Sequence, residues 1–261
     1  MRGKAAGTAW ALAGGAAALT LLTATSAHAE GRGDVRVTAT AVNKGADVVV
    51  GTTNTVTFPI AITVKDNSGV KGLTHVSAFN SSNAYGFFDW TGTSCVKQSS
   101  TTSVCTATMK ADPAWIPDSD DIDSNRIAGG WQVNATVKAN DGDYWIYDSI
   151  ARFEVKRASK LTTDASPEPV RKGAGLTVTG KLSRANWEDL KYHGFTGQQV
   201  RLQFRAAGAA HYHTVRTVKT GDAGKLSTKV TADSAGSWRW YFPGTTTTSR
   251  VVSAGDAVKL K

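Results

Sequence analysis

The stretch "TVTFPIAITVKD", residues 55–66, decides the fold class because its apolar side chains recur at every second position. Five of them share one face of an extended chain, which is typical of a half-buried β-strand: Val56, Phe58, Ile60, Ile62 and Val64. Pro59 has the opposite parity and lacks the N–H that a β-ladder needs, so we expect a free strand edge beside it.

The same alternation recurs along the chain, in "WQVNATV" (131–137) and "ARFEV" (151–155). Between them, Asp141-Gly142 is a strong hairpin signal. Similar runs follow in "LTVTGKL" (176–182), "QQVRLQF" (198–204) and "SWRWYF" (237–242). No stretch after residue 30 has a sustained helical period. The sequence therefore predicts an all-β protein built of β-sandwiches.

The aromatic run "SWRWYF" admits two interpretations. Alternation places Trp238, Trp240 and Phe242 on one face and Arg239 and Tyr241 on the other. A stacking platform for carbohydrate or nucleic acid is one interpretation, and core packing is the other. Core packing is favoured, because aromatic side chains at a spacing of two suit a sandwich interior.

The N-terminus resembles a secretory signal peptide. Arg2 and Lys4 precede an apolar stretch over residues 9–22, and "SAHAE" offers a small-residue cleavage site after Ala29. Because this apolar stretch is shorter than the about 20 residues that a membrane helix needs, we expect cleavage rather than anchoring. We therefore predict a signal peptide over residues 1–29, a secreted, extracellular protein and no membrane span after cleavage.

Charge divides the mature chain into two halves. Residues 30–157 carry 12 Lys and Arg against 14 Asp and Glu, a net charge of −2, whereas residues 158–261 carry 16 against 7, a net charge of +9. The segment "SKLTTDASPEPVRKG" (159–173), with Pro167 and Pro169, marks the boundary. We expect an acidic N-terminal domain over 30–157 and a basic C-terminal domain over 158–261.

The two cysteines, Cys95 and Cys105, both lie in the mature part. An oxidising compartment lets such a pair close, so we predict a disulfide that braces one hairpin. The short loop that it closes corresponds to a contribution of roughly 3 kcal/mol. A redox or thiol catalytic role is therefore not favoured.

Residues 160–261 resemble the immunoglobulin-like (Ig-like) module at the C-terminus of many secreted actinomycete proteins. The most specific part is "GQQVRLQFR" (197–205) followed by "YHTVRTVKTGDAGKL" (212–226). The first half is more loosely similar to bacterial Ig-like domains, through "VKDNSGV" (64–70) and "WQVNATVKANDGD" (131–143). Two-domain proteins of this kind are often described as calcium-binding. The resemblance thus implies two Ig-like β-sandwich domains in tandem, and secretion. It also suggests calcium, but names no ligand residues.

The stretch "PDSDDIDSN" (117–125) concentrates four carboxylates in a basic protein. Calcium takes six to eight oxygens from carboxylates, amides, carbonyls and water. An EF-hand loop that started at Asp121 would need Gly at the sixth position and Glu at the twelfth, where this chain has Arg126 and Gln132. An EF-hand is therefore excluded.

A looser calcium site remains, because loops gather at the ends of a β-sandwich. Three acidic turns are available: Asp66 with Asn67, the run 118–123, and Asp141 with Asp143. The last two flank one predicted strand and so lie at its opposite ends unless the acidic loop folds back. The predicted metal ligands are Asp118, Asp120, Asp121, Asp123 and Asn125, supplemented by Asp66. The alternative is a solvated acidic loop without an ion.

No common enzyme motif is present: G-x-S-x-G, H-E-x-x-H, the P-loop and the dinucleotide fingerprint are all missing. We therefore predict a non-enzymatic binding or structural protein with calcium as its cofactor. Its second domain is expected to be adhesive or envelope-associated, with an anionic cell-envelope polymer or a protein as partner, and not nucleic acid. The alternatives are a secreted protease inhibitor that presents "CVKQSSTTSVC" (95–105) and an accessory module of an extracellular hydrolase system. The tripeptide Arg32-Gly33-Asp34 is interpreted as a chance match to the integrin-binding sequence.

Overall fold

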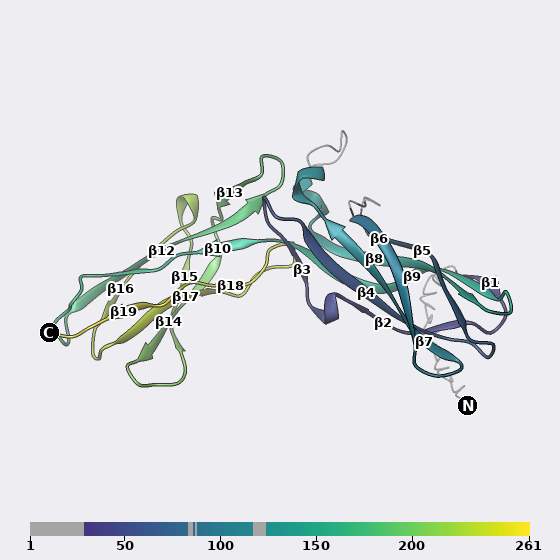
Figure 1. The fold of residues 1–261 in the computed structure, drawn as a ribbon. Helices are drawn as coiled ribbons and strands as arrows, with labels where there is room; N and C mark the ends of the chain where they lie inside the picture. The colour runs from purple at the N-terminus through teal and green to yellow at the C-terminus, as the bar shows by residue number, and fades with distance from the viewer. Residues whose placement is uncertain (1–28, 83–85, 87, 117–123) are drawn as a thin grey trace, which may run out of the picture.

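The structure is a computed structural model that describes residues 29–82, 86, 88–116 and 124–261. Its strands form four sheets around two hydrophobic cores, arranged end to end (Figure 1). The helical segments among these residues are short 3-10 turns: Asn43–Gly45, Pro113–Trp115, Ser124–Ile127 and Asp222–Gly224. No helix in the described part of the chain is long and apolar enough to cross a membrane.

The first sandwich contains two sheets. One has the strand order β1-β9-β8-β5, with β3 paired to β9 in parallel. Its strands are β1 (Ala29–Arg32), β3 (Val48–Val50), β5 (Val70–Asn80), β8 (Gly129–Ala139) and β9 (Tyr144–Arg157). The other sheet has the order β2-β4-β7-β6, with β2 (Arg36–Val42), β4 (Val56–Lys65), β6 (Phe88–Lys97) and β7 (Thr102–Ala111).

The second sandwich also has two sheets. β12 (Gly175–Asn186) is central in one, with partners β10 (Ser159–Leu161), β11 (Asp164–Ser166), β13 (Lys191–Gly194) and β16 (Lys225–Thr231). The other has the order β15-β14-β17-β18, with β19 also paired to β17. Its strands are β14 (Gln199–Ala206), β15 (His213–Lys219), β17 (Gly236–Phe242), β18 (Val251–Val252) and β19 (Asp256–Val258).

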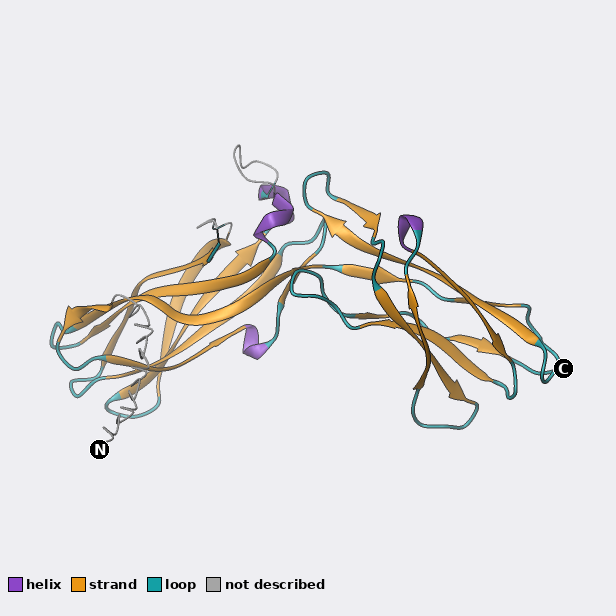
Figure 2. Ribbon diagram, turned by 180° about the vertical axis from the view of Figure 1, so that it is seen from behind, coloured by secondary structure: helices purple, strands orange, loops and turns teal. Residues whose placement is uncertain are grey.

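The strand order of the first sandwich is that of an Ig-like fold. Counted along the chain, the first, second, fifth and fourth long strands make up β2-β4-β7-β6, and the third, sixth and seventh make up β5-β8-β9. This is the division into an ABED sheet and a CFG sheet that defines the immunoglobulin sandwich. The predicted all-β, Ig-like class is therefore confirmed, and the view coloured by secondary structure shows strands throughout both halves (Figure 2).

The predicted strand faces are confirmed. Phe58, Ile60, Ile62 and Val64 are fully buried in β4, and Trp131 and Val133 pack into the same core from β8. Pairing of β4 with β2 ends at Ile60, so Pro59 has a partner in β7 but none in β2. The missing N–H of proline requires such a free edge. In β17, Trp238, Trp240 and Phe242 are buried, which confirms core packing for the aromatic run.

The predicted disulfide Cys95–Cys105 is present and joins directly opposed residues of β6 and β7. It braces a hairpin within one sheet rather than linking the two sheets. Replacing both cysteines by alanine is expected to lower the free energy of unfolding by about 3 kcal/mol, because the open chain gains loop entropy when unfolded. Urea unfolding measures this, with Val96→Ala on the same hairpin as a near-neutral control. An unchanged urea midpoint for the double variant would contradict it.

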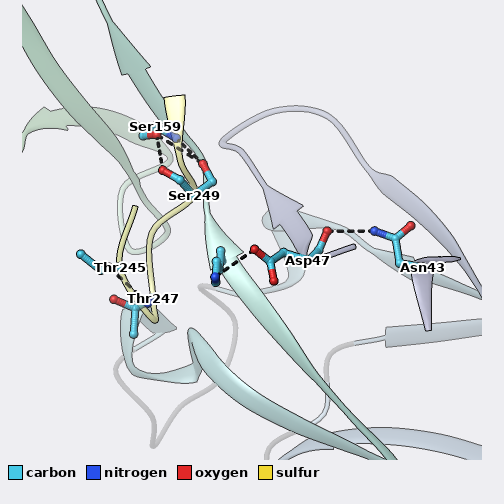
Figure 3. A network of polar contacts seen from close by, with 7 residues as sticks. Asn43, Asp47, Ser159, Thr245, Thr247 and Ser249 are labelled. Carbon is cyan, nitrogen blue, oxygen red and sulfur yellow. Dashed lines mark hydrogen bonds and ion pairs between the residues drawn. The ribbon is translucent and has the colours of Figure 1, made fainter. Parts of the chain in front are cut away.

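The segment predicted to mark the domain boundary is not an extended linker. β9 ends at Arg157 and β10 begins at Ser159, and residues 159–166 pair with β12 as the first strand segments of the second sandwich. A loop of the second sandwich returns to this point, where Ser159 Oγ donates to the carbonyl of Ser249 at 2.7 Å (Figure 3). Lys156 pairs with Asp47 at 2.9 Å beside it.

Several hydrogen bonds cross the junction between the two sandwiches. Arg157 is 7% exposed, and its Nε donates to the carbonyl of Ala185 at 2.6 Å. Its backbone N–H binds the carbonyl of Thr247, and its own carbonyl accepts from the N–H of Ser249, both at 3.0 Å. Because main-chain and side-chain bonds both cross between β9 and the second sandwich, the two halves are joined by structure rather than by a flexible segment.

Trp187 directly follows β12, yet it packs in the core of the first sandwich. It is fully buried, and its Nε1 donates to the carbonyl of Gly51 at 3.1 Å. The second sandwich therefore contributes an aromatic side chain to the first hydrophobic core.

Candidate metal centre

Three turns at the end of the first sandwich distant from the junction bring three carboxylates together: Asp34, Asp66 and Asp143. Asp34 lies in the turn between β1 and β2, Asp66 directly follows β4, and Asp143 directly precedes β9. One oxygen from each lies within 4.8 Å of the others. β1 marks this end of the molecule (Figure 1).

Asp66 is the buried member, with 2% of its surface exposed. Its Oδ1 accepts two hydrogen bonds from Ser68, from the backbone N–H at 2.7 Å and from Oγ at 2.6 Å. Its Oδ2 has no hydrogen-bond partner among the residues that the structure describes. A buried carboxylate oxygen without a partner is costly unless a cation or a donor satisfies it.

Asp143 and Asp34 are held together by the backbone. The N–H of Asp34 donates to Oδ2 of Asp143 at 2.9 Å, and the N–H of Asp143 donates to Oδ1 of Asp141 at 3.1 Å. Gly33 makes this approach feasible: its φ is +84°, and a Cβ there would lie 1.5 Å from Asp143 Oδ2. Any other residue would have a strained positive φ here and would displace the Asp143 carboxylate, so the turn favours glycine.

The electrostatics of the three carboxylates favour a cation. Partial loss of hydration and the negative charges of the neighbouring Asp66 and Asp143 carboxylates raise the pKa of Asp34. Like charges at this separation disfavour a second and third ionised carboxylate. A bound divalent cation reverses this effect by stabilising all three anions.

Hydrogen bonds connect the surrounding loops, so the carboxylates are held in place. The N–H of Asp66 donates to the carbonyl of Thr101 at 2.9 Å. Asn140 Nδ2 donates to the carbonyl of Ser68 at 3.0 Å, and the N–H of Asp141 donates to Ser68 Oγ at 3.2 Å. Ser68 thereby connects Asp66 to the β8–β9 turn, a preorganisation that lowers the entropy lost on binding an ion.

The centre opens into a depression of about 510 Å³ lined by Asp34, Arg36, Thr38, Lys65, Asp66, Asn67 and Thr101. Two cationic side chains are among these residues. Arg36 donates to the carbonyls of Gly33 and Val35 at 2.8 and 2.7 Å and stacks on Trp145 at 4.1 Å. Within the described residues, neither Arg36 nor Lys65 forms an ion pair with the three carboxylates. The carboxylates are thus not neutralised by these cations.

The donor set suits a hard cation. Carboxylates, carbonyls and waters are the ligands of hard cations such as Ca²⁺ and Mg²⁺, whereas Zn²⁺ sites use cysteine and histidine. Ca²⁺ tolerates irregular geometry and takes several waters, which suits a cluster in which Asp34 and Asp66 line an open depression.

The metal ligands predicted from the sequence differ in where they lie and in whether the structure describes them. Asp66 lies in the centre, and Asn67 lines its depression. Asp118, Asp120, Asp121 and Asp123 lie outside the described residues, and their role stays a prediction.

Asn125 lies at the junction instead. Its Nδ2 donates to Asn186 Oδ1, and its Oδ1 accepts from the N–H of Trp187 at 3.1 Å. It precedes β8, whereas Asp143 follows the same strand. Since 11 residues of strand span about 35 Å, Asn125 and the three carboxylates do not share an ion.

Comparisons with known proteins give fold likeness only. No family model and no curated protein matches the sequence. The D0-D1 domain of intimin has 13% identity and a TM-score of 0.28, with 85% of this chain and 98% of that chain covered. A putative membrane anchored protein from Corynebacterium diphtheriae has 15% identity and a TM-score of 0.28, with 82% and 52% covered. The fold assignment rests on the strand order and not on these likenesses.

Proposed function

We propose that this is an extracellular, non-enzymatic binding or structural protein whose first sandwich binds calcium at Asp34, Asp66 and Asp143. One observation carries the metal assignment: Asp66 is buried, has an oxygen without a hydrogen-bond partner among the described residues, and lies within ligand distance of two further carboxylates. The signal-like N-terminus and the Cys95–Cys105 disulfide both support secretion.

Calcium would hold three loops of the first sandwich together. It would tie the turn that follows β1 to the β4–β5 and β8–β9 loops, at the end of the sandwich that contains the β1–β2 turn. A ligand that binds only the native state raises stability by mass action, by about 2.7 kcal/mol at a hundredfold excess over Kd. The proposed role is therefore the stiffening of an extracellular module, with the basic second sandwich as its adhesive part.

Thermal unfolding of the mature chain tests the metal proposal. Adding millimolar calcium after removal of all metal by chelator is expected to raise the midpoint by about 5–10 °C. The same experiment on Asp121→Asn separates this centre from the acidic run 117–125. If Asp121→Asn abolishes the response, the ion binds in the acidic run instead. A midpoint that is the same with calcium and with chelator would remove the proposal.

Terbium, which replaces calcium at oxygen sites, reports where the ion binds. Trp145 Nε1 donates to the carbonyl of Gly33 at 3.3 Å, next to Asp34, so its indole is placed to sensitise terbium luminescence. Trp145→Phe is expected to remove most of the sensitised emission while calcium still raises the midpoint. Trp115→Phe, at an exposed position remote from the centre, is the control. Full emission from Trp145→Phe would place the ion elsewhere.

A further inference from the structure

We propose that the outer face of the β15-β14-β17 sheet binds linear phosphate polymers that carry no bases, through Arg201, Arg205 and Arg239. The proposal deepens, and rests on, the adhesive role proposed for the second sandwich. These three residues are defined here as the arginine face.

The register of the sheet places the three guanidinium groups on one surface. Arg201 is opposite Tyr241, Gln203 is opposite Arg239, and Arg205 is opposite Ser237. All of these residues have the parity that faces away from the core, whereas the alternate residues Leu202, Phe204, Trp238 and Trp240 are buried. At about 3.3 Å per residue, the cations recur roughly every 6.6 Å along the strands. A linear array of this kind fits an extended anion with evenly spaced charges.

Tyr212 positions two of the arginines. The guanidinium carbon of Arg239 lies 3.7 Å from the centre of its ring, and that of Arg205 lies 4.8 Å from it. The Tyr212 hydroxyl donates to Ser237 Oγ at 2.9 Å, which fixes the ring over the sheet. Arg239 Nε also donates to Gln203 Oε1 at 2.8 Å. Two like charges are thus held beside one ring by cation–π contacts and a neutral amide.

No carboxylate of the described residues neutralises the arginine face. Within the described part of the chain, none of its three residues forms an ion pair. The acidic residue nearest in register, Asp256, pairs with Trp238 on the core-facing parity, and its Oδ2 accepts from the N–H of Ala165 at 2.7 Å. A neighbouring depression of about 430 Å³ adds Lys259 to Arg205. The surface therefore offers uncompensated guanidinium donors, which bind phosphate oxygens in a planar, bidentate geometry.

The aromatic contacts decide among anionic polymers. Sugars and nucleobases are bound by stacking on free aromatic faces. Here the Tyr212 ring is contacted by Arg205 and Arg239, and Arg201 lies 5.7 Å from the ring centre of Tyr241. With the rings engaged by guanidiniums, recognition by charge is favoured over recognition of rings. A polymer of phosphates without bases, such as a polyol phosphate chain, matches this surface.

Long-chain inorganic polyphosphate is the probe, because it has phosphate charges but neither sugar nor base. Binding to the full mature chain is measured in chelator, so that the metal centre does not contribute. The triple variant Arg201→Gln, Arg205→Gln, Arg239→Gln is expected to lose more than about tenfold in affinity. The slope of log affinity against log salt is expected to fall by about 2, by analogy with single-stranded phosphate chains.

Two matched controls separate the arginine face from net charge. The triple variant Lys181→Gln, Lys225→Gln, Lys229→Gln removes the same charge from exposed residues of the opposite sheet and is expected to retain the affinity within about threefold. Tyr212→Ala leaves the charge unchanged but frees the two guanidiniums, and is expected to weaken binding about threefold to tenfold, whereas Tyr212→Phe retains it.

Three results would overturn the inference: no binding of polyphosphate, equal losses in both triple variants, or equal or tighter binding of single-stranded oligothymidylate or polygalacturonate. The broader adhesive role is tested separately, by co-sedimentation of the wild-type chain with purified cell-envelope fragments. If the wild type binds these fragments but not polyphosphate, the adhesive role stands and the arginine face is not its site.

Discussion

Replacing Trp187 by alanine is expected to lower the free energy of unfolding by about 3–5 kcal/mol, as for other buried aromatic side chains. Trp187 belongs to the second sandwich by chain position, yet it is fully buried in the first core. Its removal opens a cavity there and deletes the hydrogen bond to the carbonyl of Gly51. Calorimetry should therefore show two separated unfolding transitions in the variant, where the wild type unfolds with closely coupled ones.

A conservative variant of Trp187 and a control at a second tryptophan show what causes this loss of stability. Trp187→Phe retains most of the packing but loses the Nε1 donor, so it should cost about 1–3 kcal/mol. Trp115→Ala, at a tryptophan that is 43% exposed, should stay within about 0.5 kcal/mol of the wild type. A loss of less than 1 kcal/mol in Trp187→Ala would show that the junction does not depend on this side chain.

The strands were predictable because their signal is local. Alternation in residues 55–66 and 131–137 is enough to specify which side chains are buried, since side chains of an extended chain point to opposite faces in turn. The Asp141-Gly142 turn and the Cys95–Cys105 hairpin are local as well. Such features require no knowledge of which strands become neighbours.

The candidate metal centre was only partly predictable because it is assembled from distant segments. Asp66 was among the predicted ligands, and the turn of Asp143 was recognised as acidic, but Asp34 was interpreted as part of a chance tripeptide. Asp34 and Asp143 are 109 residues apart, and they meet because β1 pairs with β9 in a register that no local pattern specifies. Gly33 was the one available signal, since a glycine beside Asp34 permits the close approach of the two turns.

The junction was unpredicted for the same reason. Trp187 lies in "RANWEDL", where no alternation marks a core position. Asn125 has the residue type of a calcium ligand, but its side-chain oxygen accepts from the backbone of Trp187. Amide side chains serve metals and backbone groups equally well. Tertiary neighbours supply the backbone partner, in this case the turn that follows β12, and the metal role of Asn125 stays a prediction.

Replacing Asp66 by asparagine is expected to have effects of opposite sign in chelator and in calcium. In chelator, the variant should be at least as stable as the wild type. It removes a buried charge, retains Oδ1 as acceptor for Ser68, and turns an amide N–H₂ donor toward Asp34 and Asp143. In calcium at a hundredfold excess over Kd, the wild type should gain about 2.7 kcal/mol and the variant none.

Asp148→Asn is the matched control, because it removes the same charge from an exposed position of β9. It should leave both the chelated stability and the calcium response as in the wild type. Two results would count against the centre: a full calcium response in Asp66→Asn, or a loss of more than about 1 kcal/mol by that variant in chelator, which would make the carboxylate structural. If Asp66→Asn is the more stable protein in chelator and the wild type is the more stable protein in calcium, Asp66 is a metal ligand and not a buried structural acid. Only a metal ligand is repelled by the neighbouring carboxylates without the ion and stabilised by the ion when it is bound.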